Sequence, residues 1–273
     1  MSEITLLNAD CNEALKKIGG GTVDLIIMDP PYEFYKGGGG GAFGSKKRKY
    51  HADYLALYKE TQNESDRINA NKVRNREELK LISYGFEMSL LDVLDAKMKR
   101  VNIYIWCSKA QVGKIINHYE NKGCAVDILT WHKTNPTPTC NNTYLSDTEY
   151  LIFAREKGVK IYGNYQTKKK WYVTKANVED KKKWEHPTIK PLFIIENLII
   201  NSSLEGQTVL DCFMGSGTTG VACKKLNRNF IGIEIDEKYF NIAKERIGEA
   251  SVETIEEVEE VEIVEESGQL TFF

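Results

Sequence analysis

The tetrapeptide Asp29-Pro30-Pro31-Tyr32 directly follows the apolar run Val23–Met28, which is typical of a buried strand. Two prolines stiffen the chain and lack N–H groups, so the Asp29 carboxylate and the Pro30 carbonyl are presented at the strand's carboxyl end, where open α/β sheets bind ligands. Two such acceptors suit an exocyclic amino group. When both hydrogens of such an amino group are accepted, its nitrogen lone pair is localised on the nitrogen. That lone pair is otherwise delocalised into the aromatic ring, which makes the nitrogen a poor nucleophile. Tyr32 offers a flat face for stacking on that ring. Taken alone, the tetrapeptide would be better explained as a polar turn that ends a strand.

A second segment, Asp211-Cys212-Phe213-Met214-Gly215-Ser216-Gly217-Thr218-Thr219-Gly220, follows another apolar run and is expected to open a helix. Gly215 and Gly217 would let the backbone approach a ligand closely, and a helix N-terminus offers unpaired N–H groups. With Gly220 included, the spacing also fits the G-x-G-x-x-G of dinucleotide-binding folds, so a Rossmann-type NAD-dependent dehydrogenase is an alternative. Glu234 ends the next predicted strand, and its carboxylate could bind ribose hydroxyls in either case.

Together these segments resemble the amino-methyltransferases that use S-adenosylmethionine to modify bases in DNA. Four segments carry the resemblance: Asp10-Cys11, Asp29–Tyr32, His186-Pro187-Thr188-Ile189-Lys190-Pro191 and Asp211–Thr219. The catalytic motif precedes the glycine motif, as in the β-class permutation of these enzymes. The resemblance implies an α/β fold with a Rossmann-like, seven-stranded, mostly parallel sheet, one antiparallel strand, and helices on both faces.

The resemblance also implies a role for each matched residue. Catalysis would rest on Asp29, Pro30, Pro31 and Tyr32. The cofactor S-adenosylmethionine would be bound by Asp10, Cys11, Asp29, Lys190, Asp211, Phe213, Gly215, Gly217, Thr218, Thr219 and Glu234. In this assignment Lys190 pairs with the methionine carboxylate, Glu234 holds the ribose hydroxyls and Asp10 meets the adenine edge. For Asp10 a helix N-cap is a close alternative. His186 is given no catalytic role.

The chemistry that follows is direct methyl transfer to a flipped-out base, because a paired amino group is out of reach of any pocket. Such a reaction needs orientation and charge placement, and neither a metal nor a covalent enzyme intermediate is expected. Aspartate at position 29 resembles the adenine-N6 enzymes, whereas cytosine-N4 enzymes more often carry serine there. The sequence therefore predicts a site-specific adenine-N6 DNA methyltransferase, with a cytosine-N4 DNA methyltransferase as the alternative.

Composition limits the class of protein. The chain has 273 residues, of which 41% are hydrophobic and 28% charged, as in ordinary soluble globular proteins. It contains no run of about 18 apolar residues, so no membrane association is expected. Its six cysteines are scattered without a C-x-x-C pair, which argues against a zinc site or a disulfide framework. We expect a cytoplasmic protein associated with the nucleoid.

Charge is distributed unevenly. The segment 249–273 holds nine acidic residues and no Lys or Arg, which leaves 37 basic and 30 acidic residues, a formal charge of +7, on residues 1–248. A basic body suits double-stranded DNA as the partner. Two polar stretches, about 33–78 and 133–185, are expected to be inserted DNA-recognition segments outside the core. The candidate DNA contacts are Lys46, Lys47, Arg48, Lys49, Trp131, Lys168, Lys169 and Lys170. Surface solvation is the alternative for each lysine, and core packing for Trp131.

The expected organisation is one methyltransferase domain, residues 1–248, followed by an acidic and disordered tail, residues 249–273. The tail ends in Gln269-Leu270-Thr271-Phe272-Phe273, which resembles the short peptides that dock replication sliding clamps, although Phe272 stands where leucine is usual. Apolar residues packing back on the body are the alternative. A homodimer is left open.

Hydrophobic periodicity places the elements. Strands are expected at Ile4–Leu7, Val23–Met28, Val101–Cys107, Ala125–Trp131, Glu149–Ala154, Thr208–Asp211 and Phe230–Glu234. Helices are expected after Cys107, after Pro191, from about Thr218, and after Asp236 as N-cap.

Overall fold

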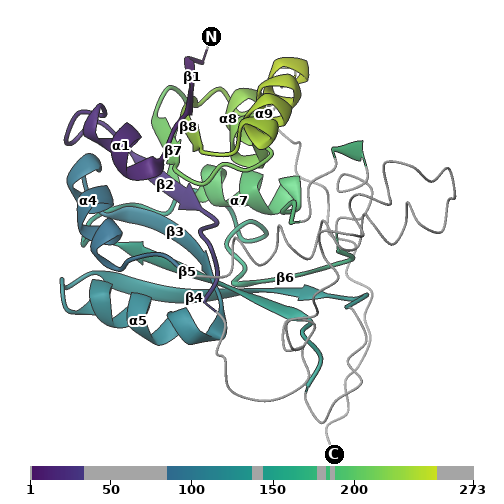
Figure 1. Ribbon diagram of the computed structural model, residues 1–273. Coiled ribbons are helices and arrows are strands. Elements are labelled where there is room, and N and C mark those ends of the chain that lie inside the picture. The colour runs from purple at the N-terminus through teal and green to yellow at the C-terminus, as the bar shows by residue number, and fades with distance from the viewer. Residues whose placement is uncertain (1, 34–84, 137–143, 177–182, 185–187, 251–273) are drawn as a thin grey trace, which may run out of the picture.

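The computed structural model describes residues 2–33, 85–136, 144–176, 183–184 and 188–250. Within these ranges the strands form one eight-stranded sheet in the order β1-β8-β7-β2-β3-β5-β4-β6 (Figure 1). The strands are β1 (Ile4–Asn8), β2 (Leu25–Met28), β3 (Asn102–Cys107), β4 (Ala125–Lys133), β5 (Thr148–Arg155), β6 (Trp171–Thr174), β7 (Thr208–Asp211) and β8 (Asn229–Glu234).

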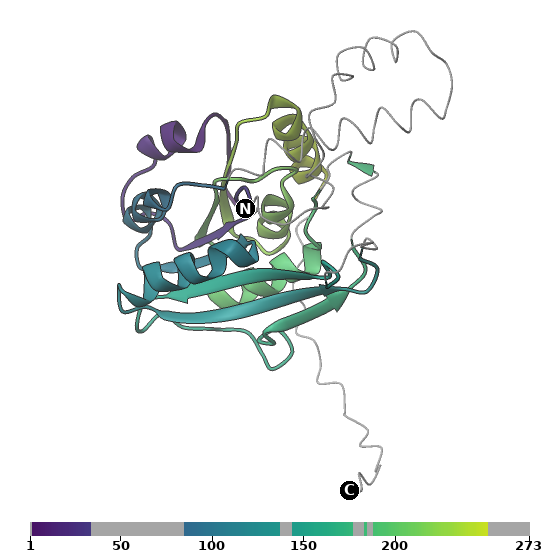
Figure 2. The same ribbon diagram turned by 60° about the horizontal axis from the view of Figure 1, so that its bottom comes forward.

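Helices cover both faces of this sheet. They are α1 (Cys11–Lys16), α4 (Ser89–Lys97), α5 (Lys109–Glu120), α7 (Leu192–Ser202), α8 (Thr218–Lys225) and α9 (Glu237–Glu249). One core cluster joins α1, α4 and α5 to strand residues such as Ile26 and Met28, and the other joins α7, α8 and α9 to Leu25 and Ile27. The purple α1 and the yellow-green α9 accordingly lie on different sides of the N-terminal strand in Figure 2. No described helix is long and apolar enough to cross a membrane.

The central strands form because their sequences are apolar throughout. All four residues of β2 and all six of β3 are buried, as expected for strands covered by helices on both faces. The helices begin at recognisable caps. Ser108 and Gln111 form a capping box at α5, and the Asp236 carboxylate accepts the N–H of Tyr239 at the start of α9.

The chain order of the strands creates a switch point between β7 and β2. The chain passes from β2 to β3 through α4 and from β7 to β8 through α8, in opposite directions along the sheet. These two helices lie on opposite faces. In open α/β sheets, ligands bind outside the carboxyl ends of the strands at such a point. The fold therefore directs attention to the segments that follow β2 and β7.

The predicted α/β fold, a mostly parallel sheet with helices on both faces, is confirmed. The antiparallel strand is β5, which pairs with β3 and β4 in the antiparallel sense. The sheet has one strand more than expected, because β6 adds a parallel edge next to β4. Part of the stretch 133–185 is also core rather than insertion, since Leu151–Ala154 of β5 are buried inside the sheet. Hydrophobic periodicity does not predict α1 or α4.

Candidate active site

Four carboxylates gather along one edge of the sheet. Asp10 follows β1, Glu234 ends β8, Asp211 ends β7 and Asp29 follows β2, and these four strands are consecutive neighbours in the sheet. Because the four strands are mutually parallel, their carboxyl ends lie at the same edge. The strand order thus brings together predicted site residues that are far apart in the chain.

The segments after β2 and β7 are direct neighbours. Ile26 pairs with Leu210 in the parallel register, so the next residues of both strands run side by side toward Asp29 and the glycine motif. The Sγ atom of Cys212 lies 3.8 Å from the Sδ atom of Met28 at this point. The expectation that positions 29–32 and 211–217 share one site agrees with this register.

Asp29 is held by a buried lysine. The Lys190 Nζ atom donates to Asp29 Oδ2 at 2.5 Å and to the Tyr32 hydroxyl at 3.2 Å. It also lies 3.2 Å from Glu149 Oε2. The Lys190 side chain is only 8% exposed, against 25% for Asp29. Lys190 directly precedes Pro191, the N-cap residue of α7. Its side chain contacts Asp29 after β2 and Glu149 of β5.

The backbone on both sides of Tyr32 is anchored to the start of α5. Gln111 donates its side-chain amide to the Pro31 carbonyl at 3.2 Å, and the Ser108 hydroxyl donates to the Glu33 carbonyl at 2.7 Å. The capping residues of α5 therefore also position the tetrapeptide Asp29–Tyr32.

Burial and ion pairing act against each other in this cluster. Burial raises the pKa of Asp29 above its ordinary value, and the Lys190 ammonium opposes this only in part. Burial would also raise the pKa of Glu149, but Lys190 and Lys133 outweigh it and bring that pKa down to about 2. For Lys190, burial lowers the pKa, and the attraction of Asp29 and Glu149 more than offsets this, so the pKa is raised. Lys190 is therefore an ammonium ion between two acidic groups.

Asp211 organises the glycine motif from within. Its Oδ1 accepts the N–H of Phe213 at 3.1 Å, and its Oδ2 accepts the hydroxyl of Thr219 at 2.6 Å. Burial raises the pKa of Asp211 to about 7 despite these two hydrogen bonds. The carboxylate ties the end of β7 to the first turn of α8.

Glu234 and the glycines shape the outer side of the same motif. Glu234 Oε2 accepts the N–H of Gly215 at 2.9 Å, and Oε1 accepts that of Asp236 at 2.9 Å. Gly217 has φ of 80°, and a Cβ atom there would lie 2.8 Å from that of Ala243, so only glycine fits. Glycine at this position lets α9 pack closely against the start of α8.

Burial alternates along the glycine motif in a way that fits a ligand. Phe213 and Gly215 are partly exposed, whereas Cys212, Met214 and the residues from Ser216 to Gly220 are buried. Glu234 is partly exposed beside them. The accessible groups are an aromatic side chain, a glycine backbone and a carboxylate, which suit the apolar, backbone-contacting and ribose parts of a nucleoside cofactor. Thr218 and Thr219 are buried in the first turn of α8.

Asp10 has a structural role. It is the N-cap of α1, and its Oδ1 accepts the N–H groups of Asn12 at 2.9 Å and Glu13 at 3.3 Å. Asp10 is exposed, so capping does not exclude a ligand contact. Burial first, and then the Asp10 charge, raise the pKa of the neighbouring Cys11 thiol to about 11. A thiol with that pKa is a poor nucleophile at neutral pH.

The candidate DNA contacts fall into three groups. Lys46–Lys49 lie outside the described residues. Trp131 is only 2% exposed, donates its indole N–H to Thr174 and packs edge-on against Trp106, so the structure places it in the core. Lys168–Lys170 precede β6, and the Lys170 ammonium pairs with Asp127.

Sequence reasoning missed Glu149 and Lys133. Glu149 begins the apolar part of β5, and Lys133 ends β4, with their ammonium and carboxylate in contact. A charged residue at the end of an apolar strand was the available signal, but its partners depend on the pairing of β4 with β5, which periodicity does not reveal.

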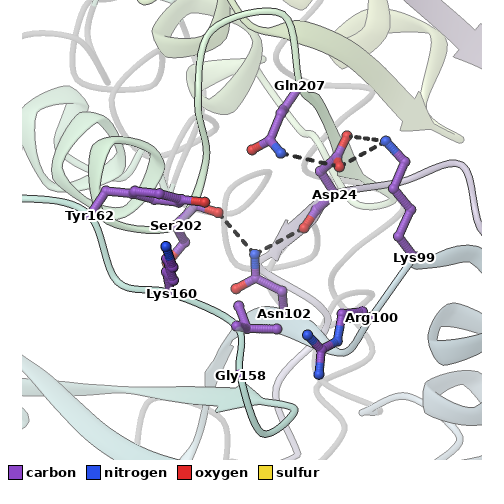
Figure 3. A pocket seen from close by; sticks show the side chains of 10 residues that line it. Asp24, Lys99, Arg100, Asn102, Gly158, Lys160, Tyr162, Ser202 and Gln207 are labelled. Atoms are coloured by element: carbon purple, nitrogen blue, oxygen red, sulfur yellow. Dashed lines mark hydrogen bonds and ion pairs between the residues drawn. The ribbon is translucent and has the colours of Figure 1, made fainter.

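A cavity of about 350 Å³ lies at the amino ends of β2 and β3. Figure 3 shows the side chains that line it. Asp24, before β2, and Asn102, at the start of β3, line it, so it is far from the carboxyl ends where the motifs meet. The Asn102 amide donates to the carbonyls of Asp24 and Ser202, both at 2.9 Å, and Asp24 pairs with Lys99 at 2.8 Å. These bonds join β2, β3 and α7, which is a structural role.

One group among the described residues has metal-ligand character, namely Asp92, Asp95 and His118. The Lys122 ammonium lies 2.6 Å from Asp92 and 2.5 Å from Asp95. Both carboxylates thus already have a cation, and the cluster lies on α4 and α5, away from the motifs.

Comparison with known proteins agrees with this site. Residues 23–245 match the DNA methylase family of N6 and N4 methyltransferases, so the chain belongs to that family. It is 30% identical to the type II methyltransferase M2.DpnII of Streptococcus pneumoniae over 93% of this chain and 92% of that protein. It is 31% identical to M2.LlaDCHI of Lactococcus lactis subsp. cremoris over 90% of each. The chain is a DNA methyltransferase that depends on S-adenosylmethionine, and the dehydrogenase alternative is wrong.

Solved structures show the same fold. The complex of M1.HpyAVI with SAM has a TM-score of 0.61 and 27% identity, covering 89% of this chain and 99% of that one. The cytosine-N4-specific PvuII DNA methyltransferase has a TM-score of 0.60 at 14% identity, which shows the fold alone.

Proposed function

We propose that this protein transfers the methyl group of S-adenosylmethionine to the N6 amino group of adenine in double-stranded DNA. The observation that carries the proposal is the carboxylate of Asp29 at the end of β2, directly beside the glycine motif after β7. A methyl acceptor bound at the first segment would face a methyl donor bound at the second.

The glycine motif fits the cofactor by its pattern of exposure. Phe213, Gly215 and Glu234 are its accessible groups, and Asp211 fixes the turn that presents them. When bound, S-adenosylmethionine supplies an electrophilic methyl group on a sulfonium. Glu234 has both oxygens on backbone N–H groups, and each keeps lone pairs that can accept ribose hydroxyls.

The reaction requires the adenine to leave the helix, because its N6 is otherwise paired. Asp29 and the Pro30 carbonyl accept the two N6 hydrogens, and Tyr32 stacks on the ring. With the donor bound, the N6 lone pair would attack the methyl carbon as the carbon–sulfur bond breaks, the neutral thioether S-adenosylhomocysteine would leave, and the proton lost by N6 would pass to solvent. Catalysis by this chain consists of orientation and charge placement.

A pair of variants tests the role of Asp29. Asp29→Ala removes the acceptor and should lower the methylation rate at least about 100-fold, while calorimetry still detects S-adenosylmethionine binding. Glu120→Ala, at the exposed end of α5, serves as the matched control and should keep the wild-type rate. Robust turnover by Asp29→Ala would refute the proposal.

DNA binding is proposed to use the basic residues of the two recognition segments, 33–78 and 133–185. Lys168–Lys170 lie before the edge strand β6, and Lys168 and Lys170 are exposed, which supports phosphate contacts there. Because type II methyltransferases are among its relatives, we further propose that the chain belongs to a restriction–modification system and acts on DNA in the cytoplasm, at the nucleoid.

Two partner predictions, a replication sliding clamp and a homodimer, stay open; the clamp peptide lies outside the residues that the structure describes. Docking of Gln269–Phe273 on a replication sliding clamp, and the acidic tail that carries it, stay predictions of the sequence. A pull-down with a clamp, lost on deletion of residues 269–273, tests the first. Sedimentation of the purified chain, with and without DNA, tests the homodimer.

A further inference from the structure

The catalytic carboxylate is the end member of a row of four alternating charges. Lys133 contacts Glu149, the Glu149 Oε2 atom lies 3.2 Å from Lys190 Nζ, and that atom lies 2.5 Å from Asp29 Oδ2. The four side chains come from β4, β5, the segment before α7 and the segment after β2. Their exposed fractions are 20%, 19%, 8% and 25% in that order.

We propose that Glu149 is a positioning residue for methyl transfer, which acts on Asp29 through Lys190. The proposal rests on the function proposed above, since it concerns how Asp29 accepts the amino group. Glu149 competes with Asp29 for the Lys190 ammonium and so leaves Asp29 charge density with which to accept the N6 hydrogens of adenine.

Asp29 and Glu149 compete because the Lys190 ammonium is enclosed by protein groups. Lys190 Nζ lies 4.9 Å from the centre of the Trp106 ring and 5.4 Å from that of Tyr32, so aromatic faces flank it. Solvent does not reach it in quantity, because the side chain is nine-tenths buried. A buried ammonium must keep anionic partners, and among the described residues the charged partners that touch it are Asp29 and Glu149.

Glu149 is suited to this role by its own surroundings. Its pKa is lowered to about 2 by Lys190 and Lys133 against the effect of burial, so it is an anion at neutral pH. It also accepts the Tyr32 hydroxyl at 3.4 Å, and so contacts the residue that stacks on the base. The arrangement couples one carboxylate to both parts of the catalytic tetrapeptide.

Glu149→Gln tests the proposal, because it keeps the shape and removes the charge. Lys190 should then pair with Asp29 alone. The turnover number kcat should fall about 10- to 100-fold, with the S-adenosylmethionine dissociation constant within about twofold of wild type. The acidic limb of the kcat–pH profile should move to lower pH by about one unit, because Asp29 loses a neighbouring negative charge and keeps the positive one. Glu149→Asp keeps the charge, so it should recover part of kcat and show a smaller shift of the acidic limb than Glu149→Gln.

Glu196→Gln is the matched control. Glu196 pairs with Lys225 at 2.8 Å, and both side chains are 20% exposed, but the pair joins α7 to α8 instead of reaching Asp29. A loss of stability alone should be similar in the two variants, whereas only Glu149→Gln should shift the pH profile. If Glu149→Gln fails to fold, the kcat–pH profile of Glu149→Asp tests the proposal instead. The shorter side chain lengthens the contact with Lys190, so the acidic limb should move to lower pH by a smaller amount than expected for Glu149→Gln.

Three results would overturn the proposal. The first is a wild-type kcat and pH profile in Glu149→Gln. The second is a weaker S-adenosylmethionine affinity at unchanged kcat, which would mean that Lys190 and Glu149 serve the methionine carboxylate. The third is the same pH shift in Glu196→Gln. Failure of the proposed function looks different, because Asp29→Ala would then still methylate DNA whatever Glu149 does.

Discussion

Asp211→Asn should change how the stability of the protein depends on pH. Burial raises the pKa of Asp211 from 3.8 to about 7 in the folded chain. Between those two values the folded state holds one proton more than the unfolded state, so stability falls as pH rises, by about 1.4 kcal/mol per pH unit. Over roughly three units the loss is at most about 4 kcal/mol at pH 8 relative to pH 4. Asparagine has no proton to lose there, so this part of the slope disappears.

The substitution also keeps the local hydrogen bonds. The asparagine oxygen can accept the N–H of Phe213, and its amide can donate to the Thr219 hydroxyl, which turns to accept. Asp211→Asn should therefore be less stable than wild type, or equal to it, near pH 4.5 and more stable near pH 8. Urea unfolding at four pH values between 4.5 and 8 measures the difference. Glu237→Gln, an exposed position at the start of α9, is the control and should follow the wild-type curve. Parallel curves for wild type and Asp211→Asn would refute the reasoning.

Three further predictions concern packing, a buried amide and the DNA contacts. Gly220→Ala places a methyl group 2.4 Å from Ile247 Cδ1 and should destabilise the protein by about 1–3 kcal/mol in urea unfolding, although alanine has the higher helix propensity. Unchanged stability would contradict the packing of α8 on α9. Asn102→Ala removes the amide that donates to the carbonyls of Asp24 and Ser202 and should cost about 2–3 kcal/mol by the same measurement, with methylation kinetics of the folded protein unaffected. Changing Lys168–Lys170 to Gln should weaken DNA binding equally for all sequences and reduce the salt slope by up to about 3 in fluorescence titrations; an unchanged slope would mean that these lysines touch no phosphate.

The parts of the fold that the sequence predicted are those with strong local signals. The apolar runs of β2, β3 and β7 are buried on both faces, and the Asp236 cap marks the start of α9. The short α1 has only six residues, with Ala14 and Leu15 buried, which is too brief for a periodic pattern. The edge strand β6 alternates between exposed Trp171 and buried Tyr172 over four residues, so its pairing with β4 depends on tertiary contacts.

The site divides in the same way. Motifs identified Asp29 and Asp211 because their chemistry is local to a strand end and the turn that follows. The motifs predict Lys190 as a site residue but not its contacts, since Asp29 lies 161 residues earlier in the chain and Glu149 lies on β5. Trp131 was left open between DNA contact and core, and its 2% exposure favours the core. Burial of an aromatic depends on the layer of residues above it, which the strand sequence does not contain.

The central claim is that Asp29 directs a methyl group to the N6 atom of adenine. The direct measurement is mass spectrometry of nucleosides from duplex DNA treated with the purified protein and S-adenosylmethionine carrying a deuterated methyl group. We predict labelled N6-methyldeoxyadenosine with the wild-type protein and none above background with Asp29→Ala. Label on N4 of cytosine, or equal label on adenine from both proteins, would contradict the account.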